Sequence, residues 1–165
     1  MWVRSEYAGE LAVLSVWANA LIPWSLSAAS KDGASLVVVR FQLFLVKYLL
    51  GVSLDAQERP IQSVVSAVSF ETGAVSDAYR FWLAGAAVFA LALLASVVYY
   101  AADDWLEATS PVDPVRLLGG LLVLAGAAET VAAVRLWGVY PGTLVPVGVL
   151  FCYLLGGLLL VVDRT

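Results

Sequence analysis

The chain lacks almost all of the side chains that metal and redox centres use. Its 165 residues include no histidine, one cysteine (Cys152) and one methionine (Met1). Haem iron takes axial ligands from His, Cys or Met, iron–sulfur clusters take several Cys, and zinc sites take Cys and His. A single Cys also cannot form an internal disulfide. We therefore expect no cofactor, no metal site and no disulfide.

The absence of histidine also limits catalysis. Ser-His-Asp and Cys-His systems need an imidazole base to activate the nucleophile. One acidic segment could bind a divalent cation through oxygen ligands, but its spacing matches no defined loop, and a solvated rim is the simpler interpretation. We expect the protein not to be an enzyme. The acidic residues concerned are Asp103, Asp104, Glu107 and Asp113.

Charged residues are scarce as well. They make up 13% of the chain, whereas hydrophobic residues make up 62% and the mean hydropathy is +0.90. A soluble domain has about 25% charged residues, so this chain could not cover a water-exposed surface. The net charge of −4 leaves no excess of basic side chains for nucleic acid. These numbers predict a membrane protein that does not bind nucleic acid.

Long apolar stretches predict the architecture. A membrane helix needs about 20 mostly apolar residues to cross about 30 Å of hydrocarbon. Asp113 and Pro114 read as the N-cap and first turn of one such helix. We predict a mainly α fold with four transmembrane helices, forming a single domain over residues 1–165 of a multi-pass protein in the cell membrane. The predicted helices cover residues 11–29, 81–101, 115–137 and 143–162.

A long first loop, residues 30–80, separates the first two predicted helices. Within residues 34–50 apolar side chains alternate, which favours strands or a hairpin. An interfacial segment is an alternative. So is a fifth span, but it would carry Arg40 and Lys47 into hydrocarbon at about 2–3 kcal/mol each. In the strand interpretation one face is wholly apolar and would cover the helix bundle or a partner; it includes Val37, Val39, Phe41 and Leu43.

Glu129 is the one acidic residue near the middle of a predicted span. An ionised carboxylate there is costly, so we expect it to be neutral, paired or next to water. It could relay protons or cations, or it could make a buried hydrogen bond to Asn19 or Arg135. Asn19, inside the first predicted helix, could line a pathway or hold helices together, which contributes about 0.6–2 kcal/mol.

Small residues recur at every fourth position of the last predicted helix, at Gly148, Cys152 and Gly156. Small faces allow helices to approach closely. They indicate either packing within one chain or association of copies. The expected partners are therefore the lipid bilayer, and either a second copy or another membrane protein, through the first loop or these helix faces.

Several segments resemble a family of uncharacterised haloarchaeal small multi-pass membrane proteins. They are WVRSEYAGE at residues 2–10, PWS at 23–25, and residues 39–51, which begin VRF and end YLLG. The likeness spans most of the chain. It implies a membrane protein but no particular activity.

The order of one helix, a loop of about fifty residues with strand character and three closely connected helices is similar to that of claudin-type tetraspans. This resemblance implies an extracellular first loop that forms a sheet, and a role in adhesion or assembly. The loop has no cysteine, so the claudin disulfide is missing. The Lys and Arg count would instead place the loop inside the cell. Our leading hypothesis is a structural or adhesive tetraspan, and the alternative is a small proton- or ion-coupled transporter or channel centred on Glu129.

Overall fold

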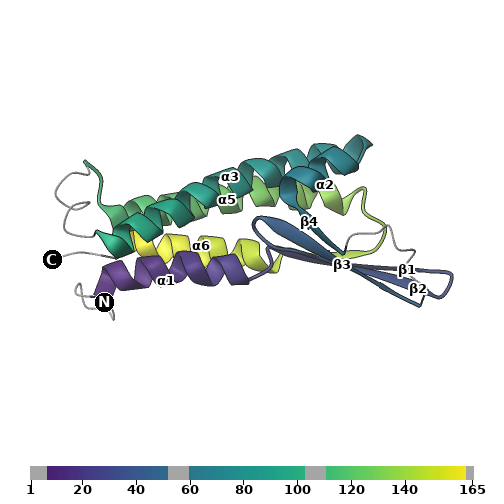
Figure 1. The fold of residues 1–165 in the computed structure, drawn as a ribbon, viewed down its shortest axis with the longest axis horizontal. Helices are drawn as coiled ribbons and strands as arrows, with labels where there is room; N and C mark the ends of the chain where they lie inside the picture. The colour runs from purple at the N-terminus through teal and green to yellow at the C-terminus, as the bar shows by residue number, and fades with distance from the viewer. Residues whose placement is uncertain (1–6, 52–59, 103–110, 163–165) are drawn as a thin grey trace.

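The computed structural model describes residues 7–51, 60–102 and 111–162. Within them the protein is mainly helical, with an antiparallel sheet at one end of a helix bundle (Figure 1). The five helices are α1 (Ala8–Leu21), α2 (Val64–Phe70), α3 (Gly73–Ala101), α5 (Pro114–Trp137) and α6 (Val147–Val161). The strands are β1 (Ser25–Lys31), β2 (Ala34–Arg40), β3 (Phe44–Leu50), β4 (Ile61–Ser63) and β5 (Thr143–Val145).

The sheet has the strand order β4-β3-β2-β1-β5, and each neighbouring pair is antiparallel. Strands β2, β3 and β4 come from the predicted first loop, whereas most of β1 lies within the predicted first helix, 11–29. The fifth comes from the last connection, where Val145 pairs with Leu26. Asp32 and Gly33, which join β1 to β2, have φ values of 52° and 84°, the left-handed region that Gly tolerates best. The sheet therefore joins the segment that follows α1 to the segment that precedes α6.

The prediction of strands within residues 34–50 is confirmed. β2 and β3 fall inside that range and pair with each other, so that Val39 lies opposite Val46. This excludes a continuous helix over these residues, and with it the fifth span. Asp113 is also confirmed as an N-cap, because its side chain accepts a hydrogen bond from the backbone N–H of Val115 at the start of α5.

The first helix differs from its predicted range, 11–29, and ends at Leu21. Pro23 explains this, since proline disfavours helical backbone at the preceding residue. Ile22 is accordingly extended, with φ −87° and ψ 124°. The last helix is shortened in the same way, because the predicted range 143–162 begins with β5 and α6 starts only after Pro146. In contrast, α3 begins at Gly73, eight residues before its predicted start at 81.

Only two of the described helices, α3 and α5, are long and apolar enough to cross a membrane. The expectation of four full-length spans is not met. The other two apolar helices, α1 and α6, have 14 and 15 residues, which at 1.5 Å per residue is about 21–23 Å. Strand β1 follows α1 and strand β5 precedes α6, and the two strands pair with each other. The longer α3 and α5 continue past α1 and α6 and cover the sheet (Figure 1).

The core consists of two adjoining clusters. One lies between the four long helices and is built around Val16, Phe89, Leu122 and Leu159. The other lies between the inner face of the sheet and helices α2, α3 and α5. It is built around two tryptophans, Trp24 and Trp82, whose ring centroids are 6.0 Å apart. The bundle and the sheet therefore each have an apolar core.

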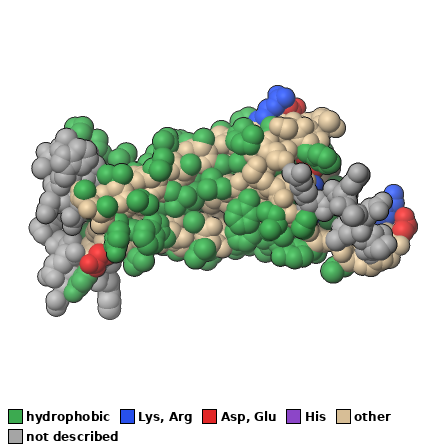
Figure 2. Space-filling view, viewed as in Figure 1, with side chains coloured by type: hydrophobic (Ala, Val, Ile, Leu, Met, Phe, Trp, Pro, Cys, Tyr) green, Lys and Arg blue, Asp and Glu red, His purple; other side chains and the backbone are tan. Residues whose placement is uncertain are grey.

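The outer surface of the bundle is apolar too. In the view of Figure 2, hydrophobic side chains run along the helices and over their junction with the sheet, while charged side chains lie towards the two ends. An apolar exterior of this kind fits lipid contact better than water contact. The two long apolar helices point the same way, to a membrane-associated protein. The exposed apolar residues include Leu14 and Leu21 of α1, Leu91, Leu94 and Val97 of α3, Leu124, Val131 and Val134 of α5, and Leu150, Leu154 and Val161 of α6.

Candidate functional site

A buried polar cluster lies where the bundle meets the sheet. Glu129 enters it from α5, Asn19 from α1, Cys152 from α6, and Gln42 from the turn between β2 and β3. All four side chains are buried. Sequence analysis singled out the first two as intramembrane polar residues and Cys152 as part of a packing face. The fold brings the three together.

The thiol of Cys152 is at the centre of the cluster. Its Sγ atom lies 3.4 Å from Oδ1 of Asn19 and 3.8 Å from Oε2 of Glu129, and can donate to either. It has one hydrogen, so it serves one acceptor at a time. Nε2 of Gln42 in turn donates to Sγ across 3.7 Å. Asn19 is fixed on its own helix, because Nδ2 donates to the backbone oxygen of Ser15 at 3.0 Å.

Gln42 is the residue of this cluster that sequence analysis missed. Its backbone oxygen accepts a hydrogen bond from Nε1 of Trp82 at 3.1 Å, which attaches the turn to α3. One glutamine therefore connects the sheet to two helices, and the cluster as a whole includes all four long helices. The available signal was a lone uncharged polar residue between Phe41 and Leu43, in a stretch otherwise rich in large apolar side chains.

The expected partners of Glu129 are only partly those found. Arg135 does not pair with it; its guanidinium lies over the ring of Phe81, 4.7 Å from the centroid. Asn19 is linked to Glu129 through Cys152. Among the described residues, Oε1 of Glu129 and Oε1 of Gln42 have no hydrogen-bond partner. Glu129 is therefore buried among uncharged polar groups without a counter-ion in the described part of the chain.

The contacts that the structure shows within the cluster are hydrogen bonds. The cluster brings one carboxyl group together with two amides and a thiol. Over the described residues, no group of three or more His, Cys, Asp or Glu side chains is arranged to hold a metal ion.

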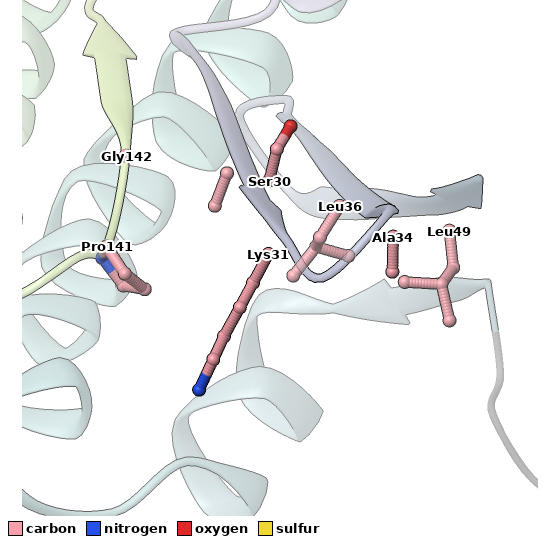
Figure 3. A pocket seen from close by; sticks show the side chains of 8 residues that line it. Ser30, Lys31, Ala34, Leu36, Leu49, Pro141 and Gly142 are labelled. Carbon is pink, nitrogen blue, oxygen red and sulfur yellow. The ribbon is translucent and has the colours of Figure 1, made fainter. Parts of the chain in front are cut away.

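A pocket of about 440 Å³ lies elsewhere, at the far end of the sheet (Figure 3). Its floor is one cross-strand row, in which Leu36 lies between Ala29 and Leu49. The turn at Pro141 and Gly142 forms another wall. None of its lining residues belongs to the polar cluster, so this pocket gives no access to Glu129.

A second buried polar group is Arg40, at the end of β2. It is fully buried; Nε donates to the hydroxyl of Tyr79 at 3.1 Å and Nη1 donates to Oγ of Ser27 at 2.8 Å. Its guanidinium also lies over two rings, 5.5 Å from the centroid of Tyr79 and 5.1 Å from that of Tyr140. Within the described chain no carboxylate forms an ion pair with it. Arg40 thus fastens the sheet to α3 through hydrogen bonds and cation–π contacts.

The small-residue face of α6 is used inside the chain. A Cβ atom added to Gly148 would lie 2.6 Å from the backbone of Pro23 and Trp24, and one added to Gly156 would lie 2.9 Å from the backbone oxygen of Gly119. Cys152 lies between them, against Gly126. The close approach that this face allows is therefore between α6 and its own neighbours.

The four residues of the predicted contact face do not lie on one face of the sheet. Val37 and Val39 lie on the outer side of the sheet, away from the bundle, whereas Val38 and Arg40 point into the core. Phe41 and Leu43 belong to the turn between β2 and β3. Phe41 stacks on Phe44 with ring centroids 4.7 Å apart.

Fold and site together define a class of protein. It is mainly helical and membrane-associated, and buried polar residues lie at the junction between its helix bundle and its sheet. The chain belongs to a family of unknown function, DUF7549, whose match covers residues 1–164. No curated protein matches the chain.

Proposed function

We propose that this protein is a non-enzymatic, structural protein of the cell membrane. In this proposal four helices are embedded in the bilayer, and they hold a preformed sheet at one membrane surface for assembly with other chains. The observation that carries it is the position of Glu129. This carboxyl group is fully buried and takes part in the contacts that join the sheet turn to the bundle. A carboxyl group in this position serves the packing of the fold and does not conduct protons or cations.

Charge positions on α5 support the embedding. Arg116 and Arg135 lie nineteen residues apart, which is about 28 Å of helix and close to the hydrocarbon thickness of about 30 Å. Between them Glu129 is the one charged residue. The shorter α1 fits the same slab, because residues 22–24 continue the chain beyond the helix until Trp24 packs against Trp82 of α3.

A test of proton and cation flux in proteoliposomes separates this function from transport. We expect the purified chain to give no more flux than empty liposomes, and Glu129→Gln to leave that result unchanged. Glu10→Gln is the matched control, since Glu10 is exposed at the start of α1. Flux that the wild type carries and Glu129→Gln abolishes, while Glu10→Gln retains it, would establish the relay and overturn the structural proposal.

Assembly is tested by photo-crosslinking in native membranes. Tyr48 is exposed on the outer side of β3, and Leu94 is exposed on the outer side of α3. We expect a photoreactive residue at position 48 to give discrete protein adducts and one at position 94 to give lipid adducts. Lipid adducts or none at position 48 would argue against the sheet as an assembly surface.

A further inference from the structure

The turn between β2 and β3, defined as residues 41–43 together with Phe44 at the start of β3, contacts the bundle through Gln42. The carbonyl of Gln42 accepts a hydrogen bond from Trp82 of α3. The residue before Trp82 is Phe81, and the guanidinium of Arg135 lies over the ring of Phe81. If Arg135 marks the edge of the hydrocarbon, the backbone of this turn lies at that edge. The amide of Gln42 reaches deeper, to Cys152 and towards Glu129, which is six residues inside Arg135. Six residues are about 9 Å of helix.

Several backbone polar groups of the turn have hydrogen-bond partners within the protein, as a site poor in water requires. The N–H of Phe41 donates to the carbonyl of Phe44 at 2.8 Å, and the carbonyl of Leu43 accepts from the N–H of Val64 at 2.9 Å. The carbonyl of Gln42 is bonded to Trp82. Non-helical backbone at membrane depth requires such internal partners, because lipid offers none.

The side chains of the turn are sorted by polarity. Gln42, the polar one, is 1% exposed and faces the bundle. Leu43 and Phe44 are 39% and 38% exposed. The ring of the half-buried Phe41 stacks on the ring of Phe44. Apolar side chains at this depth meet acyl chains rather than water.

We infer that this turn is a lipid-contact element, with Phe41, Leu43 and Phe44 resting in the acyl chains of one leaflet while Gln42 anchors them to the bundle. The inference rests on the proposed embedding of the helices. It gives the sheet a second support on the membrane in addition to its covalent connections to α1 and α6. The outer side of the sheet farther from the bundle, with Tyr48, then remains in water and free for protein partners.

Site-directed spin labelling measures this directly. Leu43→Cys, Phe44→Cys, Leu94→Cys and Tyr48→Cys are labelled one at a time, with Cys152 retained because it is buried. The unsubstituted chain taken through the same labelling reports any background. The proteins are reconstituted in phosphatidylcholine–phosphatidylglycerol vesicles, and collision of the label with oxygen and with a water-soluble nickel chelate is measured.

We expect positions 43 and 44 to behave as position 94 does, with high oxygen collision and nickel collision severalfold below that at position 48. Nickel collision at 43 and 44 equal to that at 48 would show a water-exposed turn and overturn the inference. Low collision with both reagents would show a turn covered by protein, such as a second copy, and would overturn it equally. High nickel collision at position 94 would instead remove the embedding on which the proposed function depends, so the two failures are distinct.

Discussion

The side-chain amide of Gln42 donates to Sγ of Cys152 across 3.7 Å, which joins the turn between β2 and β3 to the middle of α6. The two residues are 110 positions apart in the chain. Their contact couples the sheet to the bundle in a buried region. The stability of the fold should therefore depend on a few polar side chains at this junction.

Truncating the glutamine should destabilise the protein. Gln42→Ala removes the donor to Cys152 and opens a buried void, and we expect a loss of about 2 kcal/mol in the free energy of unfolding. Chemical unfolding in detergent micelles, followed by tryptophan fluorescence, measures this loss. Gln62→Ala is the control, because Gln62 lies on the short edge strand β4 and is only half-buried. A cost at position 62 that equals or exceeds that at position 42 would contradict the assigned anchor.

Arg40 should tolerate a hydrophobic replacement better than a charged one. Arg40→Lys keeps a buried charge but loses the planar fork that reaches both Tyr79 and Ser27, so we expect a cost of about 2–4 kcal/mol. Arg40→Met removes the charge at similar length and should cost less. The order of the two unfolding midpoints is the measurement. Arg80→Lys, at an exposed ion pair with Asp77, should change stability by less than about 0.5 kcal/mol.

Two glycines should respond in opposite ways to the same substitution. At Gly148 an added Cβ would lie 2.6 Å from the backbone of Pro23 and Trp24, which cannot move aside cheaply. We expect Gly148→Ala to cost about 1–3 kcal/mol through overpacking. At Gly120 of α5 an added Cβ meets nothing within 4 Å. Gly120→Ala should be neutral or stabilise by up to about 1 kcal/mol, and thermal unfolding of the pair compares them.

Cys152 should resist thiol reagents for as long as the fold is intact. Its side chain is fully buried between α1, α5 and the sheet turn. We expect a maleimide to leave the folded protein unmodified in mild detergent and to label it fully after denaturation, as measured by intact mass. Rapid labelling of the folded protein would mean that water reaches the polar cluster, and it would weaken the structural interpretation of Glu129.

The sequence predicted β2 and β3 because their signal is local, whereas most of β1 and all of β5 lie within ranges predicted as helices. Apolar alternation within residues 34–50 suffices for β2 and β3. The ends of α1 and α6 were harder to predict. Hydropathy continues smoothly through Pro23 and Pro146, so an apolar window does not separate a helix from a buried strand. The pairing of β5 with β1 brings together segments more than a hundred residues apart, and no local pattern reports it.

The candidate site was predicted in parts. Glu129 and Asn19 stand out because a polar residue inside an apolar stretch is visible in one dimension. Gln42 and Arg40 did not stand out, since each falls in a loop segment where polar residues are ordinary. Their burial follows from the sheet folding back against α3.

Composition alone pointed to association with a membrane, because so few charges on so apolar a chain suit lipid better than water as the solvent for its surface. Spacing alone determined the approximate positions of its helices and central strands. Tertiary structure decided how two short helices pass into one sheet, and which polar groups meet beneath that sheet. Such contacts depend on the close packing of segments distant in sequence, and that information is carried by the three-dimensional arrangement of the chain.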